Sequence, residues 1–128
     1  MNTGATDTVT ERHGLRLLVC AADGPALGSD QDAADLVGAA MGNDADLIVI
    51  PVARLDPTFF ALGSGVAGQM LQKFVNYRYR VVILGDITTH LTTSAALQAL
   101  VRESNRGQDA WFLADEAELD AQLAGRRW

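Results

Sequence analysis

The residues with the clearest potential for chemistry form a glycine-rich stretch near the middle of the chain. The run from Gly63 to Gly68 (Gly-Ser-Gly-Val-Ala-Gly) has the GxGxxG spacing of a dinucleotide-binding loop, and Asp86 follows 18 residues after its last glycine. Such a loop must follow a strand directly, so that the turn delivers a phosphate to the amino end of a helix. The preceding apolar run ends near Val52, about ten residues too early, which favours close helix packing by small residues instead.

Ser64, flanked by Gly63 and Gly65, has a second potential role at the start of the same predicted helix. A serine at a helix start accepts a hydrogen bond from a backbone N–H two or three residues later. A phosphate on the same hydroxyl would be stabilised by the helix dipole. Ser64 is therefore a candidate cap and a candidate phosphorylation switch.

Asp86 follows the third apolar run, where the phosphoacceptor of a receiver-type domain would lie. Such a site also needs further acids and a lysine at another strand end, but the only lysine, Lys73, falls within a predicted helix. His90 could pair with Asp86 or Glu103 as an acid–base couple, although no serine or cysteine nucleophile is placed beside them by spacing. A turn-forming aspartate and a solvated loop histidine are the favoured interpretations.

A metal site or a structural cofactor is not indicated. The two histidines, His13 and His90, are far apart in the sequence, and there is no CxxC pair. Cys20 is the only cysteine and lies in an apolar run, which predicts a buried, inert thiol and fits a reducing compartment.

A polar face follows the glycine-rich stretch along the predicted helix. Its residues recur at spacings of three and four: Gln69, Gln72, Lys73 and Asn76. Such a face is either solvated or a contact surface for another protein or for a second copy of the domain. Glu103 and Asn105 belong to a second polar stretch, Glu103 to Gly107, at the end of the next predicted helix.

These side chains must be positioned by alternating strands and helices. Apolar runs predict four strands, at residues 15–21, 47–52, 80–87 and 110–113. Each is followed by a helical pattern, and capping-box sequences at Ser29–Asp32 and Asp115–Glu118 mark two of the helix starts. The βαβαβαβα order predicts one α/β domain with a four-stranded, mainly parallel sheet. Ligands of such sheets bind beyond the carboxyl ends of the strands, an edge that here carries Asp86.

Length and charge narrow the functional classes. The 128 residues fit one domain, predicted at residues 14–128 after a flexible polar tail at residues 1–13. A net charge of −6 argues against a nucleic-acid or anionic-membrane surface. No apolar stretch is long enough to span a bilayer, so a cytoplasmic protein is expected.

At this point the sequence resembles a known bacterial family, domain of unknown function 4180. The stretch Asp56 to Tyr77 carries the resemblance, with Ile83–Asp86 and Glu103–Gly107 as further matching segments. The similarity covers roughly residues 14–124, and its most specific part is Gln72 to Tyr77. The family has no settled activity, and it commonly has an acidic residue where this chain has Gln69.

The order of elements is also similar to that of the STAS domains, the sulfate-transporter and anti-sigma-factor-antagonist modules. In those domains a serine at the start of the corresponding helix is the phosphorylated switch, which the resemblance places at Ser64. Their motif normally has an acidic residue nearby, whereas Leu62 and Gly63 precede Ser64 here.

No motif identifies a reaction, so a binding module is favoured over a self-contained enzyme. The first hypothesis is a non-catalytic regulatory module that binds a protein partner through residues 63–77, with Ser64 as a phosphorylation switch. The alternative is a small-ligand or nucleotide-binding domain, which could be an enzyme, using Gly63–Gly68, Asp86 and His90. A structural subunit that forms a homodimer through the polar helix face is a third option.

Overall fold

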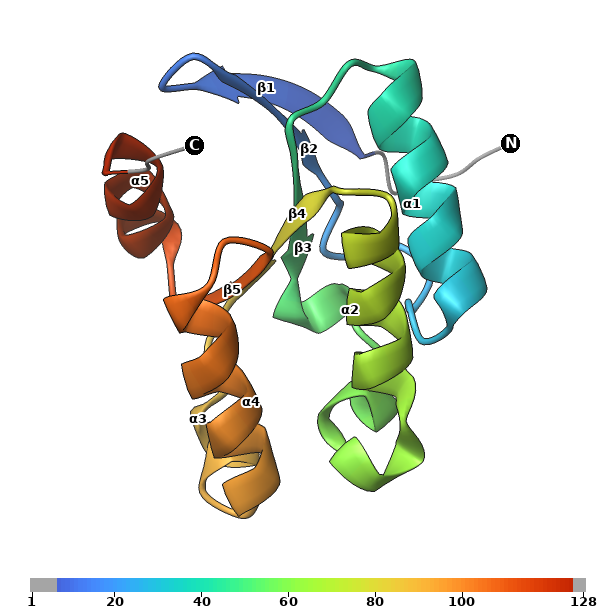
Figure 1. Cartoon of the computed structure of the whole chain (residues 1–128), viewed down its shortest axis with the longest axis vertical. Helices are drawn as coiled ribbons and strands as arrows, with labels where there is room; N and C mark the ends of the chain where they lie inside the picture. The colour runs from blue at the N-terminus through green and yellow to red at the C-terminus, as the bar shows by residue number, and fades with distance from the viewer. Residues whose placement is uncertain (1–6, 126–128) are drawn as a thin grey trace.

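The computed structural model describes residues 7–125, which form a single five-stranded sheet with helices on both faces (Figure 1). The strands are β1 (Thr8–Arg12), β2 (Leu15–Val19), β3 (Leu47–Pro51), β4 (Arg80–Leu84) and β5 (Ala110–Leu113). They lie side by side in chain order. β1 runs antiparallel to β2, and all other neighbouring strands are parallel. The predicted α/β fold with a mainly parallel sheet is confirmed, but the sheet has five strands and not four.

The additional strand, β1, lies in the segment that was expected to be a flexible tail. It pairs with β2 along its whole length. His13 and Gly14 connect the two strands with φ angles of 51° and 79°, as the two-residue hairpin turn of type I′ requires. Val9 is the only apolar residue of β1, so the composition of this edge strand resembles that of a tail. The expectation is wrong for residues 8–13, and residues 1–6 lie outside the described part of the chain.

The helices divide unequally between the two faces of the sheet. One face carries α1 (Asp30–Gly42), α2 (Val66–Asn76) and α4 (Ala95–Arg106), while α5 (Glu116–Ala124) covers the other (Figure 1). Right-handed crossovers between parallel strands taken in chain order place the connecting helices on one side. Short helical turns fill the connections: η1 (Val52–Arg54), η2 (Pro57–Phe60), η3 (Leu62–Ser64) and α3 (Thr88–Leu91).

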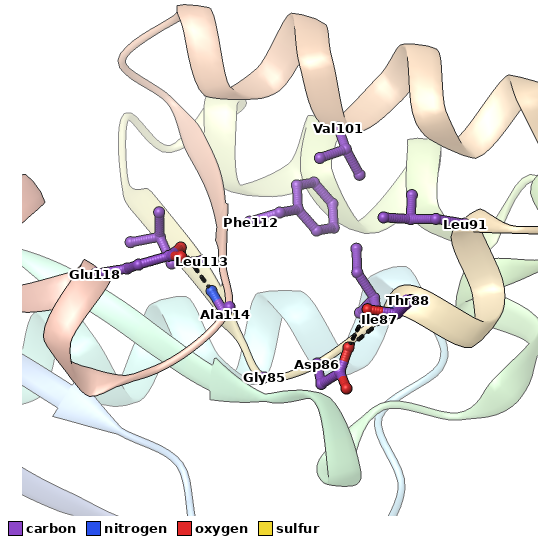
Figure 2. Close-up of a pocket in the computed structure, with 10 residues that line it drawn as sticks. All are labelled: Gly85, Asp86, Ile87, Thr88, Leu91, Val101, Phe112, Leu113, Ala114 and Glu118. Carbon is purple, nitrogen blue, oxygen red and sulfur yellow. Dashed lines mark hydrogen bonds between the residues drawn. The ribbon is translucent and has the colours of Figure 1, made fainter.

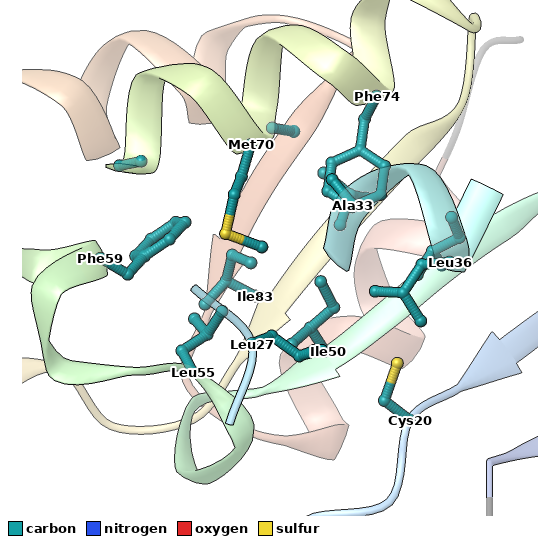
Figure 3. Close-up of a cluster of buried hydrophobic side chains, with 14 of the residues drawn as sticks. Cys20, Leu27, Ala33, Leu36, Ile50, Leu55, Phe59, Met70, Phe74 and Ile83 are labelled. Carbon is teal, nitrogen blue, oxygen red and sulfur yellow. The ribbon is translucent and has the colours of Figure 1, made fainter. Parts of the chain in front are cut away.

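Each of the strands β2 to β5 contributes to two cores. Ile48 and Ile50 of β3 face the larger core beneath α1, α2 and α4, where Met70 and Phe74 of α2 are fully buried (Figure 3). The intervening Val49 faces a second core beneath α5. Because both faces are covered, the parallel strands have continuous apolar sequences, the pattern from which they were predicted.

The N-terminal hairpin is tied to α5 on the second face. Arg12 forms an ion pair with Glu116 at 2.6 Å, and His13 Nε2 lies 2.8 Å from Asp120 Oδ1. These contacts join the first strand of the sheet to a helix more than a hundred residues later.

Both helix starts predicted from capping-box sequences are present, and both have the expected N-cap bond. The Asp32 N–H donates to Ser29 Oγ, and Asp32 Oδ2 in turn accepts a bond from the Gly28 N–H at 2.8 Å. At α5, the Glu118 N–H donates to Asp115 Oδ1 at 2.9 Å. Among the helices of residues 7–125, none has the length and apolar character needed to cross a lipid bilayer.

Candidate functional site

Two Asp-x-Thr turns follow β3 and β4 at the carboxyl edge of the sheet. Asp56 Oδ1 accepts hydrogen bonds from the Thr58 N–H at 3.0 Å and from Thr58 Oγ1 at 2.8 Å. Asp86 Oδ1 makes the same pair of bonds with Thr88, to its N–H at 2.9 Å and to its hydroxyl at 2.5 Å. The predicted turn-forming role of Asp86 is therefore confirmed.

These hydrogen bonds lower the pKa of both carboxyl groups. The Thr88 hydroxyl is the largest cause of the lowered pKa of Asp86, followed by the Thr88 backbone N–H. For Asp56 the order is reversed, with the Thr58 N–H first. A donor bonded to the ionised form favours that form. Both residues are therefore carboxylates at neutral pH.

The Ser64 turn lies at the same edge as Asp86, as the sequence predicts. The Ser64 hydroxyl donates to the Thr58 carbonyl at 2.8 Å, which joins η3 to η2. Phe60 of η2 stacks on His90 of α3 with ring centroids 4.2 Å apart and ring planes 10° from parallel. This stack brings the two turns together and gives the His90 ring a packing role.

The helix after the glycine-rich stretch begins later than the sequence predicts. Its first residue is Val66 and its N-cap is Gly65, with φ of 81°, so Ser64 is not the cap. Ser64 is exposed, and its Oγ accepts a bond from the Val66 N–H at 3.2 Å. β3 ends at Pro51 and three helical turns intervene, so Gly63 does not follow a strand as a dinucleotide loop requires.

Close packing within the domain does not explain the glycines either. A Cβ added at Gly63 or Gly68 would meet no atom of the described residues within 4 Å. The expectation that these small residues bring α2 close to its neighbours is therefore wrong at both positions. Gly65 differs, because its left-handed backbone favours glycine.

A pocket of about 170 Å³ opens between the ends of β4 and β5 (Figure 2). We call it the edge pocket. Its lining residues come from β5, from the loops after β4 and β5, from α3 and α4, and from the start of α5: Gly85, Asp86, Ile87, Thr88, Leu91, Val101, Phe112, Leu113, Ala114 and Glu118. The apolar side chains of Ile87, Phe112 and Leu113 are buried.

The polar residues of the edge pocket lie at its rim. Asp86 and Glu118 are exposed. Glu118 Oε1 accepts a bond at 2.9 Å from the N–H of Ala114, the residue before the N-cap Asp115. Gly85 lets this loop pass close to Val52. Its φ of 144° disfavours other residues, and an added Cβ would lie 2.9 Å from Val52 Cγ2.

A second hollow, about 350 Å³, runs between α2 and α4, and we call it the helical groove. It is lined by Gly68, Leu71, Gln72, Val75, Leu100, Glu103, Ser104, Gly107, Asp109 and Ala110. It therefore brings together Gln72 and Glu103, which the sequence had placed in two separate polar stretches. Leu71 and Leu100 are partly buried, and Val75 is 39% exposed.

Lys73 and Asn76 lie on the other side of α2, towards α1. Lys73 Nζ is 3.8 Å from Asp30 Oδ2, and Gln72 Nε2 donates to Asn76 Oδ1 at 2.8 Å. With Gly68 and Gln69 these residues line a broad surface hollow. The polar face predicted from helical spacing thus extends from α1 to the helical groove.

The side chain of Asn105 forms hydrogen bonds with the edge of the sheet. Its side-chain amide accepts a bond from the Phe112 N–H at 2.7 Å and donates to the Phe112 carbonyl at 3.1 Å. β5 is an edge strand, so Asn105 occupies the place where a further strand would pair. The structure thus gives this predicted site residue two bonds to the backbone of its own chain.

Sequence analysis missed one charged residue inside the domain, Arg54, which is 7% exposed. Its guanidinium donates to the carbonyls of Pro25 and Ala21 and forms an ion pair with Asp7 at 3.1 Å. A Cβ on Gly24 would lie 2.3 Å from its Cζ, so Gly24 leaves room for the guanidinium. Arg54 is a cross-link between loops, and only the apolar residues around it in the sequence indicate burial.

The environment of Cys20 bears on its predicted inertness. Cys20 is buried, and burial, followed by the nearby Asp7 carboxylate, raises its pKa to about 12. The predicted inert thiol is consistent with this environment. Within residues 7–125, no group of three or more histidine, cysteine or acidic side chains could hold a metal ion.

Comparison with known proteins identifies a family. Residues 12–123 match the family described as Domain of unknown function (DUF4180), a range that contains the edge pocket and the helical groove. No curated protein and no solved structure gives a significant match. Since the matched range covers most of the sequence, the chain belongs to the family domain of unknown function 4180.

Proposed function

We propose that this domain is a non-catalytic protein-binding module and that its partner docks in the helical groove. The observation that carries this proposal is a break in the layer of helices. α1 packs closely along α2, whereas α2 and α4 diverge and leave the groove between them (Figure 1). Apolar side chains of Leu71, Val75 and Leu100 are consequently left partly exposed.

The position of Gly68 favours a partner that packs closely against α2. It lies in α2 at the edge of the groove, where a glycine costs about 0.5–1 kcal/mol of stability relative to alanine. No atom of residues 7–125 lies within 4 Å of the place where its missing Cβ would be. A backbone or large side chain of a partner would use that space.

The rim of the groove indicates the chemistry of the partner. Glu103 and Asp109 are exposed acids on the α4 side, and the whole chain carries a net charge of −6. The ion pair of Glu103 with Arg106 is itself exposed, and such pairs contribute little. We therefore expect an amphipathic helix whose apolar side chains enter the groove and whose basic side chains lie beside these acids.

Two matched glycine variants test the groove. Gly68→Gln places a side chain in the groove, while Gly38→Gln makes the same change on the exposed face of α1, where an added Cβ also meets open space. Tagged wild-type and variant domains are used to capture proteins from the producing cells, and any protein lost only with Gly68→Gln is purified. Titration calorimetry with that protein should show binding at least about tenfold weaker for Gly68→Gln.

Gly38→Gln should bind the same purified protein as tightly as the wild type. Both variants should be at least as stable as the wild type, because glutamine is a better helix former than glycine. Equal binding by all three domains would remove the groove as the docking surface.

The proposal includes a regulatory role for Ser64. Its exposed hydroxyl lies at the amino end of α2, one turn before Gly68, and the resemblance to STAS domains favours a phosphorylated serine there. A phosphoryl group would replace the hydrogen that Ser64 donates to the Thr58 carbonyl. Phosphorylation would thereby loosen η2 and η3 next to the docking helix.

A second candidate function is the binding of a small ligand at the carboxyl edge, beside Asp86. The edge pocket favours it, because apolar walls with a few polar groups at the rim are typical of small-molecule sites. A nucleotide is a poor fit, since the pocket is smaller than the usual range of about 300–1,000 Å³ and α2 lacks a strand directly before it. A ligand much smaller than a nucleotide is favoured.

A further inference from the structure

We propose, on the basis of this small-ligand function, that the edge pocket binds a small organic cation: an amine with an apolar body about the size of benzene. The proposal does not depend on the helical groove. It combines the size and apolar character of the pocket with the charge of its rim (Figure 2).

The volume of the pocket limits the apolar body. A cavity of roughly 150 Å³ lined by aliphatic and aromatic side chains binds benzene, and the edge pocket holds about 170 Å³. Ile87, Leu91 and Phe112 surround the space on one side in Figure 2, with Val101 of α4 above them. One six-membered ring or a short alkyl chain fits these walls.

The rim adds negative charge and no positive charge. Asp86 and Glu118 each use one carboxylate oxygen for a local bond, to Thr88 and to Ala114 respectively. In residues 7–125, the second oxygen of each accepts no hydrogen bond or ion pair from the chain. None of the described residues that line the pocket is lysine, arginine or histidine. An ammonium group at the mouth would be attracted by these carboxylates, and a carboxylate there would be repelled.

Three probes of nearly the same shape separate the effect of charge on affinity from the effect of shape: benzylamine, benzyl alcohol and benzoate. Each is titrated into the isotope-labelled domain while backbone amide shifts are followed by NMR. Benzylamine should shift the amides of Ile87, Thr88 and Ala114 and bind about tenfold more tightly than benzyl alcohol. Benzoate should bind more weakly than the alcohol.

Charge-removing variants test the assignment to the two carboxylates. Asp86→Asn and Glu118→Gln keep an oxygen that can accept the local bonds, so each should leave the loop in place. Each should reduce the preference for benzylamine over benzyl alcohol to about threefold or less. Asp56→Asn is the matched control, because it makes the same change in the other Asp-x-Thr turn, outside the pocket, and should keep the full preference.

The outcomes distinguish this inference from the function on which it rests. Equal affinities for benzylamine and benzyl alcohol would refute a cation site but would still support the proposal that the pocket binds a small ligand. No shift with any probe up to about 10 mM would refute both. A loss of preference in Asp56→Asn as large as in Asp86→Asn would also refute the assignment, because a general surface charge would then explain it.

Discussion

Individual side chains at the carboxyl edge act first on their own backbone. Asp56 and Asp86 hold Asp-x-Thr turns, and Ser64 accepts from one N–H and donates to one carbonyl. Aspartate and serine are the residue types that phosphoryl chemistry uses, and they are also the types that form turns. Sequence spacing alone does not separate these roles, which is why both interpretations of Ser64 and Asp86 arise from the sequence.

The lowered pKa of Asp86 gives a pH dependence of stability with a definite sign. A carboxyl group whose folded pKa lies below its unfolded value of 3.8 contributes stability above that value and loses the contribution as the pH falls through the folded pKa. Asp86→Asn should therefore be less stable than the wild type at pH 7, and this difference should shrink at about pH 3. Urea unfolding at the two pH values measures it.

Thr88→Val is the companion variant, because it removes the hydroxyl that lowers the pKa of Asp86 most. In Thr88→Val the pKa of Asp86, followed by carboxyl NMR, should rise towards 3.8. A stability difference between wild type and Asp86→Asn that is the same at both pH values would contradict the assigned hydrogen bonds.

The proposed switch at Ser64 predicts a change in affinity for the partner that is identified with the Gly68→Gln variant. Ser64→Asp adds negative charge at the amino end of α2 and removes the bond to the Thr58 carbonyl, so it should change the partner's Kd by about fivefold or more. Ser64→Ala removes the hydroxyl without adding charge and should change it by less than twofold. Calorimetry with both variants is the measurement. If neither variant alters the affinity, Ser64 is not a switch for this partner.

At the scale of elements, the structure closes one edge of its sheet with a side chain. Asn105 pairs with both polar backbone groups of Phe112 on β5 and leaves no room there for another strand. Unprotected edges invite pairing with other chains. A residue that the sequence presented as part of a polar binding stretch therefore also protects the sheet.

Replacing this amide should weaken the edge measurably. Asn105→Ala leaves two partly buried backbone groups without their partner, which costs about 1–3 kcal/mol of unfolding free energy. The Phe112 amide should also exchange its hydrogen faster. Asn76→Ala is the control, since that amide bonds the exposed Gln72 side chain on the same helix and no backbone group of another element within residues 7–125, and it should cost less than about 0.5 kcal/mol. Similar losses in the two variants would contradict the role of Asn105.

Elements with a strong apolar pattern could be predicted, and those set by unusual backbone geometry could not. β2 to β5 and the starts of α1 and α5 follow from apolar runs and capping boxes. β1 carries too few apolar residues to show a pattern, and the hairpin depends on positive φ at His13. α2 begins at Val66 because Gly65 adopts a left-handed conformation, which a helical spacing rule does not register.

At the scale of the whole molecule, the edge pocket and the helical groove are formed by the spacing between helices and strands. The sequence could place Asp86 and the Ser64 turn at one edge, because the ends of parallel strands meet there. It could not show that α2 and α4 diverge, or that Val101 and Glu118 would line one pocket, because those distances depend on packing between residues far apart in the chain. Arg54 is similar, since its partners lie 29 to 47 positions earlier.

The second core cannot form until α5 has been synthesised. Leu119 and Leu123 of α5 are fully buried against strand residues such as Leu17 and Val49, yet α5 follows every strand in the chain. A ribosome therefore releases β2, β3 and β4 well before it releases the helix that shields their second face. During that interval an apolar sheet is open to chaperones or to other nascent chains. The second face of the sheet is therefore completed only when α5 has been synthesised and has docked against it.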